Sequence, residues 1–383
     1  MSAFPHLPIS PSPHLHRTPY PVVSASRLKA NILRMQALAT HAGVRLRPHA
    51  KTHKSPVIAR MQLEAGAVGI CCAKLGEAEV FADQGITDIR LPYPVNPSNA
   101  DRAIALMDRV TLSIIVDDED VARDWSSAMV RAGKKLNVLV KIDVGFHRCG
   151  MDPASPDLVA RITRIAALPG ITFRGLLSHA GHAYHASSHD ELAAMAATET
   201  AIMIGLADTL RASGVQVDEI SVGSTPTASF APTQRGITEM RPGNYVFYDR
   251  TQVGLGSAKI SDCAMFVVAS VVSRPARDRM ILDCGSKTLT NDGARGFADA
   301  PGHGLVFLSA SEDVPDTGVV VERLSEEHAT CRVPVDSPLR PGDRVRVLPN
   351  HACTVTNLMD SLVLAGDDGT MEPLVVAARG RIW

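Results

Sequence analysis

Between about residues 22 and 255, short apolar runs alternate with amphipathic segments, and this alternation constrains the fold more than any other feature. The first amphipathic segment has one apolar helical face, formed by Leu28, Ile32, Met35 and Leu38. The predicted strands are Val44–Pro48, Val68–Cys72, Ile89–Leu91, Leu112–Val116, Val138–Ile142, Phe173–Leu177, Ile220–Val222 and Glu239–Arg241. The predicted helices include Pro56–Leu63, Leu75–Asp83, Asp118–Arg131, Asp157–Ala167 and Asp190–Ser213. About eight strand–helix units in roughly 230 residues predict a TIM-type (β/α)8 barrel. A doubly wound open sheet shows the same alternation and remains the alternative.

The pattern changes after about Gly256, where short β-rich runs separated by Gly, Pro and Asp replace the helical periodicity. The predicted strands there are Val267–Val272, Arg279–Asp283, Gly318–Glu322, Ala329–Val333 and Arg344–Leu348. Such runs predict an antiparallel β domain. The sequence thus divides into an irregular, proline-containing lead-in (residues 1–21), a β/α barrel (22–255) and a β domain (256–383).

Composition excludes several classes of partner and compartment. The chain has 383 residues, of which 45% are hydrophobic, which is enough for two domains with sizeable cores. The formal net charge is −1 and no dense Lys/Arg run occurs, so nucleic acids and anionic membranes are not expected as partners. No apolar run approaches the ~20 residues of a membrane span, so we expect no membrane-spanning segment, and we expect no signal peptide. Seven cysteines without framework spacing favour free thiols in a reducing cytoplasm.

The octapeptide RPHAKTHK, residues 47–54, is the strongest chemical motif. It follows a short predicted strand and precedes a predicted helix. A lysine at the end of an inward-facing strand is desolvated, so part of its amine is neutral and can form a Schiff base. A basic surface loop is the structural alternative.

This octapeptide resembles the RPHxKTHK signature of the D-threonine aldolase and D-serine dehydratase group, which are pyridoxal phosphate (PLP) enzymes of alanine-racemase-like fold. The resemblance covers nearly the whole chain and assigns the cofactor imine to Lys51 rather than to Lys54. It implies a barrel followed by a β domain, with the lead-in packed against that domain. It also implies an active site between the domains of a homodimer.

Two turns near the last predicted barrel strands suit a phosphate, since backbone N–H groups and hydroxyls bind anions well. One turn follows Val222 and the other follows Arg241, near strands 7 and 8, where TIM barrels commonly bind phosphate. Both resemble the family's phosphate-binding turns. The matching residues are Gly223, Ser224, Thr225, Gly243, Asn244 and Tyr245.

Further residues take cofactor roles by the same resemblance. Arg241 matches the arginine that faces the pyridine nitrogen in alanine racemases, where a cation keeps the nitrogen unprotonated. Arg148, in a segment like the family's KIDxGxxR, approaches the phenolic oxygen of the ring; the structural alternative is an ion pair with Asp143. Tyr184 is placed to contact PLP or substrate.

His351-Ala352-Cys353 follows a predicted strand, and in extended chain residues two apart point to the same side. Imidazole and thiolate together favour Zn²⁺. Mn²⁺ and Mg²⁺ are the divalent alternatives. Two protein ligands leave positions open for water and substrate, as in catalytic sites. Relatives carry a zinc pair here, and the His-x-Cys form resembles that of D-serine dehydratases.

The implied reaction is a lyase reaction on a small D-3-hydroxy amino acid such as D-serine, D-threonine or D-3-hydroxyaspartate. Dehydration would yield a 2-oxo acid and ammonia, with Lys51 taking the α-proton and the metal activating the β-hydroxyl. Retro-aldol cleavage to glycine and an aldehyde is the alternative and needs a base near the metal. The candidates for that base are His179, His182 and His185.

Three other functions are less favoured. Racemases of this fold use a tyrosine from the β domain, and this chain has no tyrosine after Tyr248. A non-catalytic PLP carrier would typically lack the β domain with His351 and Cys353. A metal-dependent barrel hydrolase would lack PLP.

Overall fold

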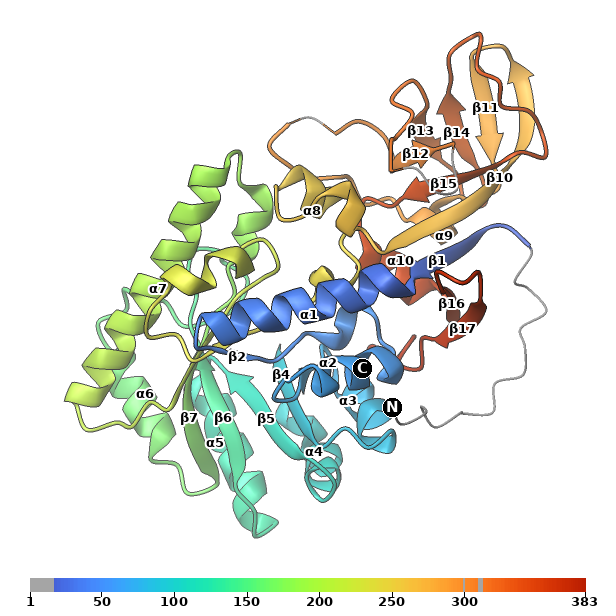
Figure 1. Cartoon of the computed structure of the whole chain (residues 1–383). Helices are drawn as coiled ribbons and strands as arrows, with labels where there is room; N and C mark the ends of the chain where they lie inside the picture. Colours follow the sequence, from blue (N-terminus) through green and yellow to red (C-terminus); the bar gives the residue numbers. More distant parts are fainter. Residues whose placement is uncertain (1–16, 299, 309–312) are drawn as a thin grey trace.

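The computed structural model describes residues 17–298, 300–308 and 313–383, and it confirms a barrel followed by a β domain (Figure 1). The barrel strands are β2 (Arg45–Leu46), β3 (Ile70–Cys71), β4 (Asp88–Pro94), β5 (Thr111–Val116), β6 (Leu136–Lys141), β7 (Ile171–Leu177), β8 (Glu219–Val222) and β9 (Glu239–Met240). All neighbours in this curled sheet are parallel, in the order β2-β9-β8-β7-β6-β5-β4-β3. A parallel bridge between His49 and Cys71 links the segment after β2 to β3. The spatial order follows the chain without the reversal of a doubly wound sheet, so the barrel prediction is the correct one.

Helices alternate with the barrel strands; α1 (Ala25–His41) precedes β2, and α8 (Arg250–Gly254) comes after β9 and lies near the β domain (Figure 1). The others are α2 (Pro56–Glu64), α3 (Leu75–Asp83), α4 (Ala100–Met107), α5 (Glu119–Arg131), α6 (Leu158–Ala166) and α7 (His189–Ala212). Local sequence explains their starts: the Asp118 carboxylate caps α5 by accepting the N–H groups of Asp120 and Val121 at 2.9 and 3.0 Å. The fully buried side chain of Trp125 packs α5 against the rest of the barrel.

Several barrel strands are shorter than predicted. β2 has two residues where the sequence predicts Val44–Pro48, and β9 ends at Met240 rather than at Arg241. Pro48 has no N–H for the ladder, and the chain after it turns into the 3-10 helix η1 (Ala50–Thr52). The short strands therefore end where the chain bends toward the site.

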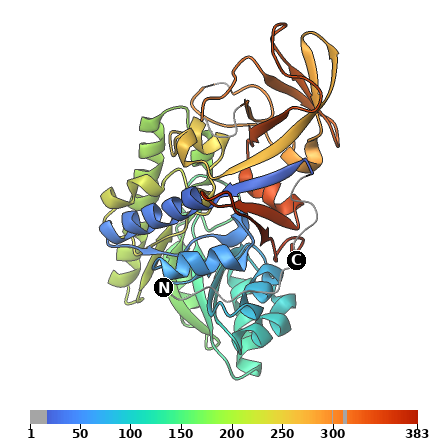
Figure 2. The same cartoon turned by 45° about the vertical axis from the view of Figure 1, so that its right-hand side comes forward.

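The second domain is a nine-stranded sheet. Its strands are β1 (Tyr20–Ser24), β10 (Met265–Ala276), β11 (Arg279–Leu282), β12 (Leu305–Phe307), β13 (Val320–Leu324), β14 (Ala329–Arg332), β15 (Arg344–Leu348), β16 (Ser361–Ala365) and β17 (Met371–Val375). β1 pairs antiparallel with β10 and parallel with β16, and it continues directly into α1 on the barrel (Figure 2). Tyr20 and Pro21 are thus part of a strand and not of an irregular lead-in, because distant strands supply the backbone partners. Residues 1–16 of the predicted lead-in lie outside the described residues.

The β domain also contains two short helices that the periodicity did not predict, α9 (Ser286–Leu289) and α10 (Ala352–Leu358). Helices of four and seven residues are too short to give a clear 3.6-residue pattern. α10 matters for the site, because it packs against η1, the segment that contains Lys51.

One described helix, α7, has the length and apolar composition of a membrane span, which corrects the expectation that no segment does. In the structure α7 packs on β7 and β8. Its inward residues include a carboxylate, Glu199, which accepts a hydrogen bond from the Ser178 hydroxyl at 2.6 Å. This packing is that of a barrel helix.

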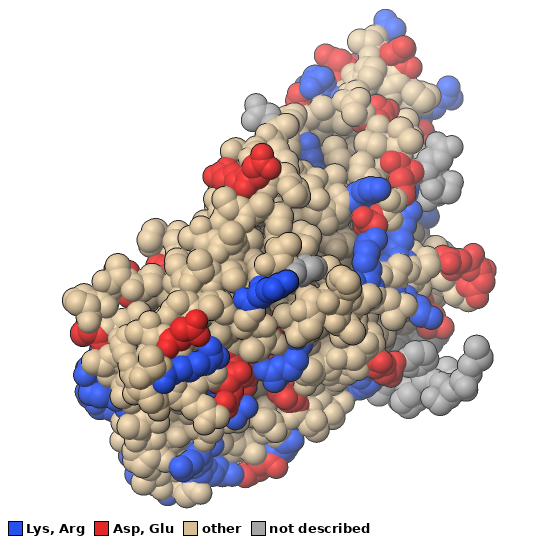
Figure 3. All heavy atoms as spheres, turned by 60° about the vertical axis from the view of Figure 1, so that its left-hand side comes forward, with Lys and Arg blue, Asp and Glu red and all other residues tan. Residues whose placement is uncertain are grey.

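Charged side chains of both signs are interspersed on the face shown in Figure 3. On the described surface as a whole, many charged side chains form local pairs, such as Arg102 with Glu79 and Arg164 with Glu119. This face presents no extended surface of one sign.

Candidate active site

A cavity of about 210 Å³ lies where the carboxyl ends of the barrel strands meet the β domain. Barrel residues that line it follow β2, β6, β7, β8 and β9, and His351 and Cys353 come from the β domain after β15. Every predicted site residue lines this cavity except His182, His185 and Tyr245. Long-range folding therefore unites motifs that the sequence keeps up to three hundred residues apart.

Lys51 lies in η1, which starts directly after His49. The Nδ1 atom of His49 accepts the backbone N–H of Lys51 at 3.3 Å. The Lys51 side chain is exposed to the cavity, and the surrounding protein atoms partly desolvate the amine. This desolvation lowers the pKa of Lys51 and outweighs the attraction of Cys353, while Arg148 and Arg241 lower the pKa further. A larger fraction of the amine is therefore neutral and nucleophilic than in a surface lysine.

Both predicted phosphate turns line the cavity. Gly223 has a φ of +114°, a backbone conformation that favours glycine, and Ser224 and Thr225 follow it. Gly243 packs so closely that a Cβ would lie 2.9 Å from the carbonyl oxygen of His49. Glycine at this position lets the second turn lie directly against the lysine-bearing segment.

Arg241 is buried at the barrel side of the cavity. Its Nε donates to the Ser221 hydroxyl at 2.8 Å, and its Nη2 donates to the carbonyl oxygens of Ser178 and, at 3.4 Å, Ser221. These hydrogen bonds hold the Arg241 guanidinium group in one position. The family resemblance places the pyridine ring of PLP next to it.

His179 contributes an imidazole whose Nδ1 lies 3.2 Å from the carbonyl oxygen of Gly223. A carbonyl can only accept, so Nδ1 carries the proton and Nε2 is a free acceptor in the neutral ring. Burial, then the charges of Lys141, Lys51 and Arg241, hold the pKa of His179 well below its usual range. His179 is therefore neutral near pH 7, and its Nε2 can accept a proton or a hydrogen bond from a group in the cavity.

Arg148 lies over the Phe146 ring, with its guanidinium carbon 5.0 Å from the ring centroid. The alternative ion pair with Asp143 is not formed: the Asp143 carboxylate instead binds the N–H groups of Gly145 and His147 and the His147 imidazole. Arg148 therefore remains directed to the cavity.

His351 and Cys353 lie together at the start of α10 and not in extended chain as the sequence predicts. His351 has extended backbone and Cys353 lies in the first helical turn, so the helix start brings imidazole and sulfur together. Burial opposes both charged forms, but mutual attraction outweighs it, raising the pKa of His351 and lowering that of Cys353. The Cys353 Sγ also lies 3.2 Å from the Thr52 hydroxyl, next to Lys51 in sequence.

A carboxylate that the sequence did not single out orients His351. The His351 Nδ1 lies 2.7 Å from Asp292 Oδ2, which also accepts the Thr354 hydroxyl at 3.1 Å. Nδ1–H bound to a carboxylate leaves Nε2 for a metal, the usual arrangement of histidine ligands. The described residues contain no group of three metal-ligating side chains, so an ion here would have two protein ligands from this chain.

Three predicted residues lie elsewhere. His185 is outside this cavity and lines a separate pocket with Ala294 and Phe297. Tyr245 is fully buried, and its hydroxyl accepts a hydrogen bond from the Gln62 amide at 2.9 Å, so only its backbone belongs to the phosphate turn. His182 lies against the loop at Gly145, outside the cavity lining. Reasoning from sequence also missed His49 and Thr52, although the octapeptide contains both, and Asp292, for which no local signal existed.

The donors around the cavity fit both groups that the resemblance implies. For PLP they supply a desolvated amine, a buried guanidinium and two glycine turns with hydroxyl groups. For a zinc ion they supply a thiolate and an imidazole oriented by a carboxylate.

Comparison with known proteins gives two domain matches. The alanine racemase N-terminal domain matches residues 23–251, and a serine dehydratase domain matches residues 264–365. The D-threo-3-hydroxyaspartate dehydratase of Delftia sp. HT23 is 34% identical over 93% of this chain and 96% of its own. Its solved structure superposes with a TM-score of 0.88 over 94% of this chain and 97% of that chain. A cysteine-to-alanine mutant of that enzyme is described as being in a metal-free form.

Two further relatives have other activities. A D-threonine aldolase of Arthrobacter sp. is 33% identical over 97% of this chain and 96% of its own. A D-serine dehydratase of Dictyostelium discoideum is 30% identical over 92% of this chain and 94% of its own. The relatives are thus lyases that differ in the bond they break.

Proposed function

Because the chain belongs to the alanine-racemase-like family that includes D-serine dehydratases and D-threonine aldolases, we propose that it is a PLP- and zinc-dependent lyase. Its proposed substrates are D-3-hydroxy amino acids, and its proposed reaction is dehydration to a 2-oxo acid and ammonia. One observation carries the proposal: the low-pKa amine of Lys51 and the His351–Cys353 pair line the same cavity. The Thr52–Cys353 contact of 3.2 Å joins the two parts.

Different residues would bind the phosphate of PLP, its ring nitrogen and the metal ion. Gly223, Ser224 and Thr225 in one turn and Gly243 and Asn244 in the other would hold the phosphate of PLP. Arg241 would face the ring nitrogen. His351 and Cys353 would hold the metal ion, with zinc preferred over Mn²⁺ or Mg²⁺ because a thiolate is a soft ligand.

When bound, PLP acidifies the α-carbon of the amino acid, and the metal activates the β-hydroxyl as a leaving group. Lys51 Nζ would take the α-proton, and its lowered pKa favours the neutral amine that this role requires. A single base on one face of the substrate acts on one enantiomer, which we propose to be D.

Retro-aldol cleavage is the second candidate, and the position of His179 favours it. Its neutral ring lines the cavity with a free Nε2, as a base that removes the β-hydroxyl proton would require. The Arthrobacter aldolase, at 33% identity, is as similar to this chain as the dehydratases are.

Product analysis separates the two reactions. The purified protein, loaded with PLP, is incubated with D-serine, D-threonine and D-threo-3-hydroxyaspartate, with added Zn²⁺ or with EDTA. We expect 2-oxo acid and ammonia in equal amounts, with loss of activity in EDTA and recovery with Zn²⁺. Glycine with an aldehyde would establish the aldolase reaction instead, and turnover of the L-enantiomers alone would contradict the proposed stereochemistry.

We also propose that the protein is a cytoplasmic homodimer. The seven cysteines are free thiols, as suits a reducing compartment. Light scattering coupled to size-exclusion chromatography tests the dimer, which would have twice the 40.8 kDa of the chain.

A further inference from the structure

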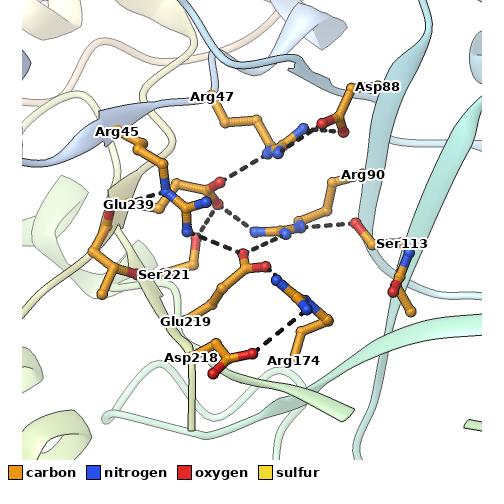
Figure 4. A network of polar contacts seen from close by, with 12 residues as sticks. Arg45, Arg47, Asp88, Arg90, Ser113, Arg174, Asp218, Glu219, Ser221 and Glu239 are labelled. Atoms are coloured by element: carbon orange, nitrogen blue, oxygen red, sulfur yellow. Dashed lines mark hydrogen bonds and ion pairs between the residues drawn. The ribbon is translucent and has the colours of Figure 1, made fainter. Parts of the chain in front are cut away.

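A layer of buried ion pairs lies between the barrel strands (Figure 4). We call Arg47, Arg90, Glu219 and Glu239 the ionic layer. Arg47 Nε lies 2.8 Å from Glu239 Oε2, Arg90 Nη2 lies 2.7 Å from Glu219 Oε2, and Arg90 Nη1 binds Glu239 Oε1. The Glu239 side chain is 0% exposed and those of the two arginines at most 5%. Buried ion pairs often add little to stability compared with apolar packing, so this layer calls for another explanation.

Ser221 connects the ionic layer to the cavity. Its hydroxyl donates to Glu239 Oε1 at 2.6 Å and accepts the Nε–H of Arg241 at 2.8 Å. An ionised carboxylate cannot donate and a guanidinium cannot accept, so the hydroxyl has only one orientation here. Burial alone would raise the pKa of Glu239, but the charges of Arg90 and Arg47 lower it to about 2, so the carboxylate stays ionised.

The same contacts determine which part of Arg241 is left for a ligand. Nε and Nη2 are used by Ser221 and Ser178 at the barrel side. Among the described residues, Nη1 has no hydrogen-bond partner, and Arg241 lines the cavity. The barrel therefore offers one edge of the guanidinium to a bound group.

We propose that Ser221 and Glu239 are positioning residues that hold Arg241 against the PLP ring, and that the ionic layer serves to anchor them. This inference rests on the proposed function, since it assumes that PLP occupies the cavity. Alternation along β9 supports it: Glu239 and Arg241 are two residues apart in an extended segment, so both point into the barrel. β9 and the residue directly after it thus supply both the anchor, Glu239, and the group that it anchors, Arg241.

The test is titration of PLP into cofactor-free protein, with the absorbance maximum of the bound cofactor as a second readout. For Ser221→Ala we expect a Kd about tenfold higher, because a hydrogen bond to a charged group is lost. We also expect a shifted absorbance maximum, because the cation at the ring moves. Neither readout requires turnover.

Ser113→Ala is the matched control. Ser113 is a buried serine that accepts the Nε–H of Arg90 at 2.9 Å in the same network, but it has no contact with Arg241. We expect the PLP affinity and the absorbance maximum of Ser113→Ala to equal those of the unchanged protein. Equal changes in both variants would mean that the network acts only through general stability, which overturns the proposal.

A double-mutant cycle with Arg241→Ala decides whether Ser221 acts through Arg241. If it does, the double variant binds PLP as weakly as Arg241→Ala alone. Additive losses overturn the proposal. Failure of the unchanged protein to bind PLP would refute the proposed function itself, whereas normal PLP binding by Ser221→Ala refutes only this inference.

Discussion

Lys51 shows how the surroundings of one residue determine its chemistry, since desolvation by the cavity walls lowers its pKa. We predict that Lys51→Ala abolishes covalent attachment of PLP, so borohydride no longer fixes the cofactor to the chain. Mass spectrometry of the reduced protein measures this. Lys54→Ala is the control, because Lys54 pairs with Glu77 at 3.0 Å and lies outside the cavity lining. A reduced adduct in Lys51→Ala would show that another lysine carries the cofactor.

Cys353 is the second decisive residue, because its thiolate is one of two protein ligands proposed for the metal. We predict that Cys353→Ala retains PLP but loses bound metal, with turnover reduced roughly a hundredfold or more. Metal content by elemental analysis and activity with added Zn²⁺ test this. Cys149→Ala is the matched control, since Cys149 is a free thiol outside the cavity lining. Unchanged turnover in Cys353→Ala would refute the metal assignment.

At the scale of elements, the barrel positions the start of α10, and Asp249 is the connecting residue. Its Oδ2 accepts the Asn244 amide at 2.6 Å and the Ala352 N–H at 2.9 Å, and its Oδ1 caps α8 at Gln252 N. In Asp249→Asn one amide N–H must face another donor, whichever way the amide is turned. We therefore predict metal binding weakened by roughly 10- to 100-fold, measured by competition with a chelating dye.

The control for this element is Asp118→Asn in α5. Asp118 is also an N-cap, but it bonds only the N–H groups of Asp120 and Val121, and asparagine caps helices equally well. Its metal affinity should not change. Equal metal affinity in Asp249→Asn would show that α10 is held by other contacts.

At the scale of the whole molecule, the ionic layer makes stability depend on acid pH. The folded-state pKa of Glu239 is about 2, against an ordinary value of 4.5. Because the folded pKa is the lower one, this stabilisation is fully present above about pH 4.5 and is lost as the pH falls from there toward 2. Its size is on the order of 3 kcal/mol.

We therefore predict that Glu239→Gln lowers the free energy of unfolding at pH 7 and flattens its decline between about pH 4.5 and 2. Urea unfolding at a series of pH values measures both effects. Glu322→Gln serves as the control, since Glu322 forms an exposed pair with Arg332 and such pairs contribute little. If the free energy of unfolding of Glu239→Gln declined between about pH 4.5 and 2 as steeply as that of the unchanged protein, other carboxylates would control acid unfolding.

Much of the architecture was determined by the sequence, because helical and strand periodicity are local properties. The strand–helix alternation predicted the barrel, and Leu75–Asp83 and Arg344–Leu348 were predicted with the observed bounds. Lys51, the two glycine turns and the His351–Cys353 pair were also readable, because their chemistry resides in short motifs.

Only the tertiary structure decided how these motifs meet. The start of α10 brings imidazole and sulfur together, contrary to the expected extended geometry, and Asp292 orients His351 from 59 residues away. The side chain of Tyr245 points into the helix packing, although its neighbours line the cavity. The contacts from Glu239 through Ser221 to Arg241 arise between adjacent barrel strands. Side-chain direction and long-range pairing depend on packing across the whole molecule, and no local pattern in the sequence contains that information.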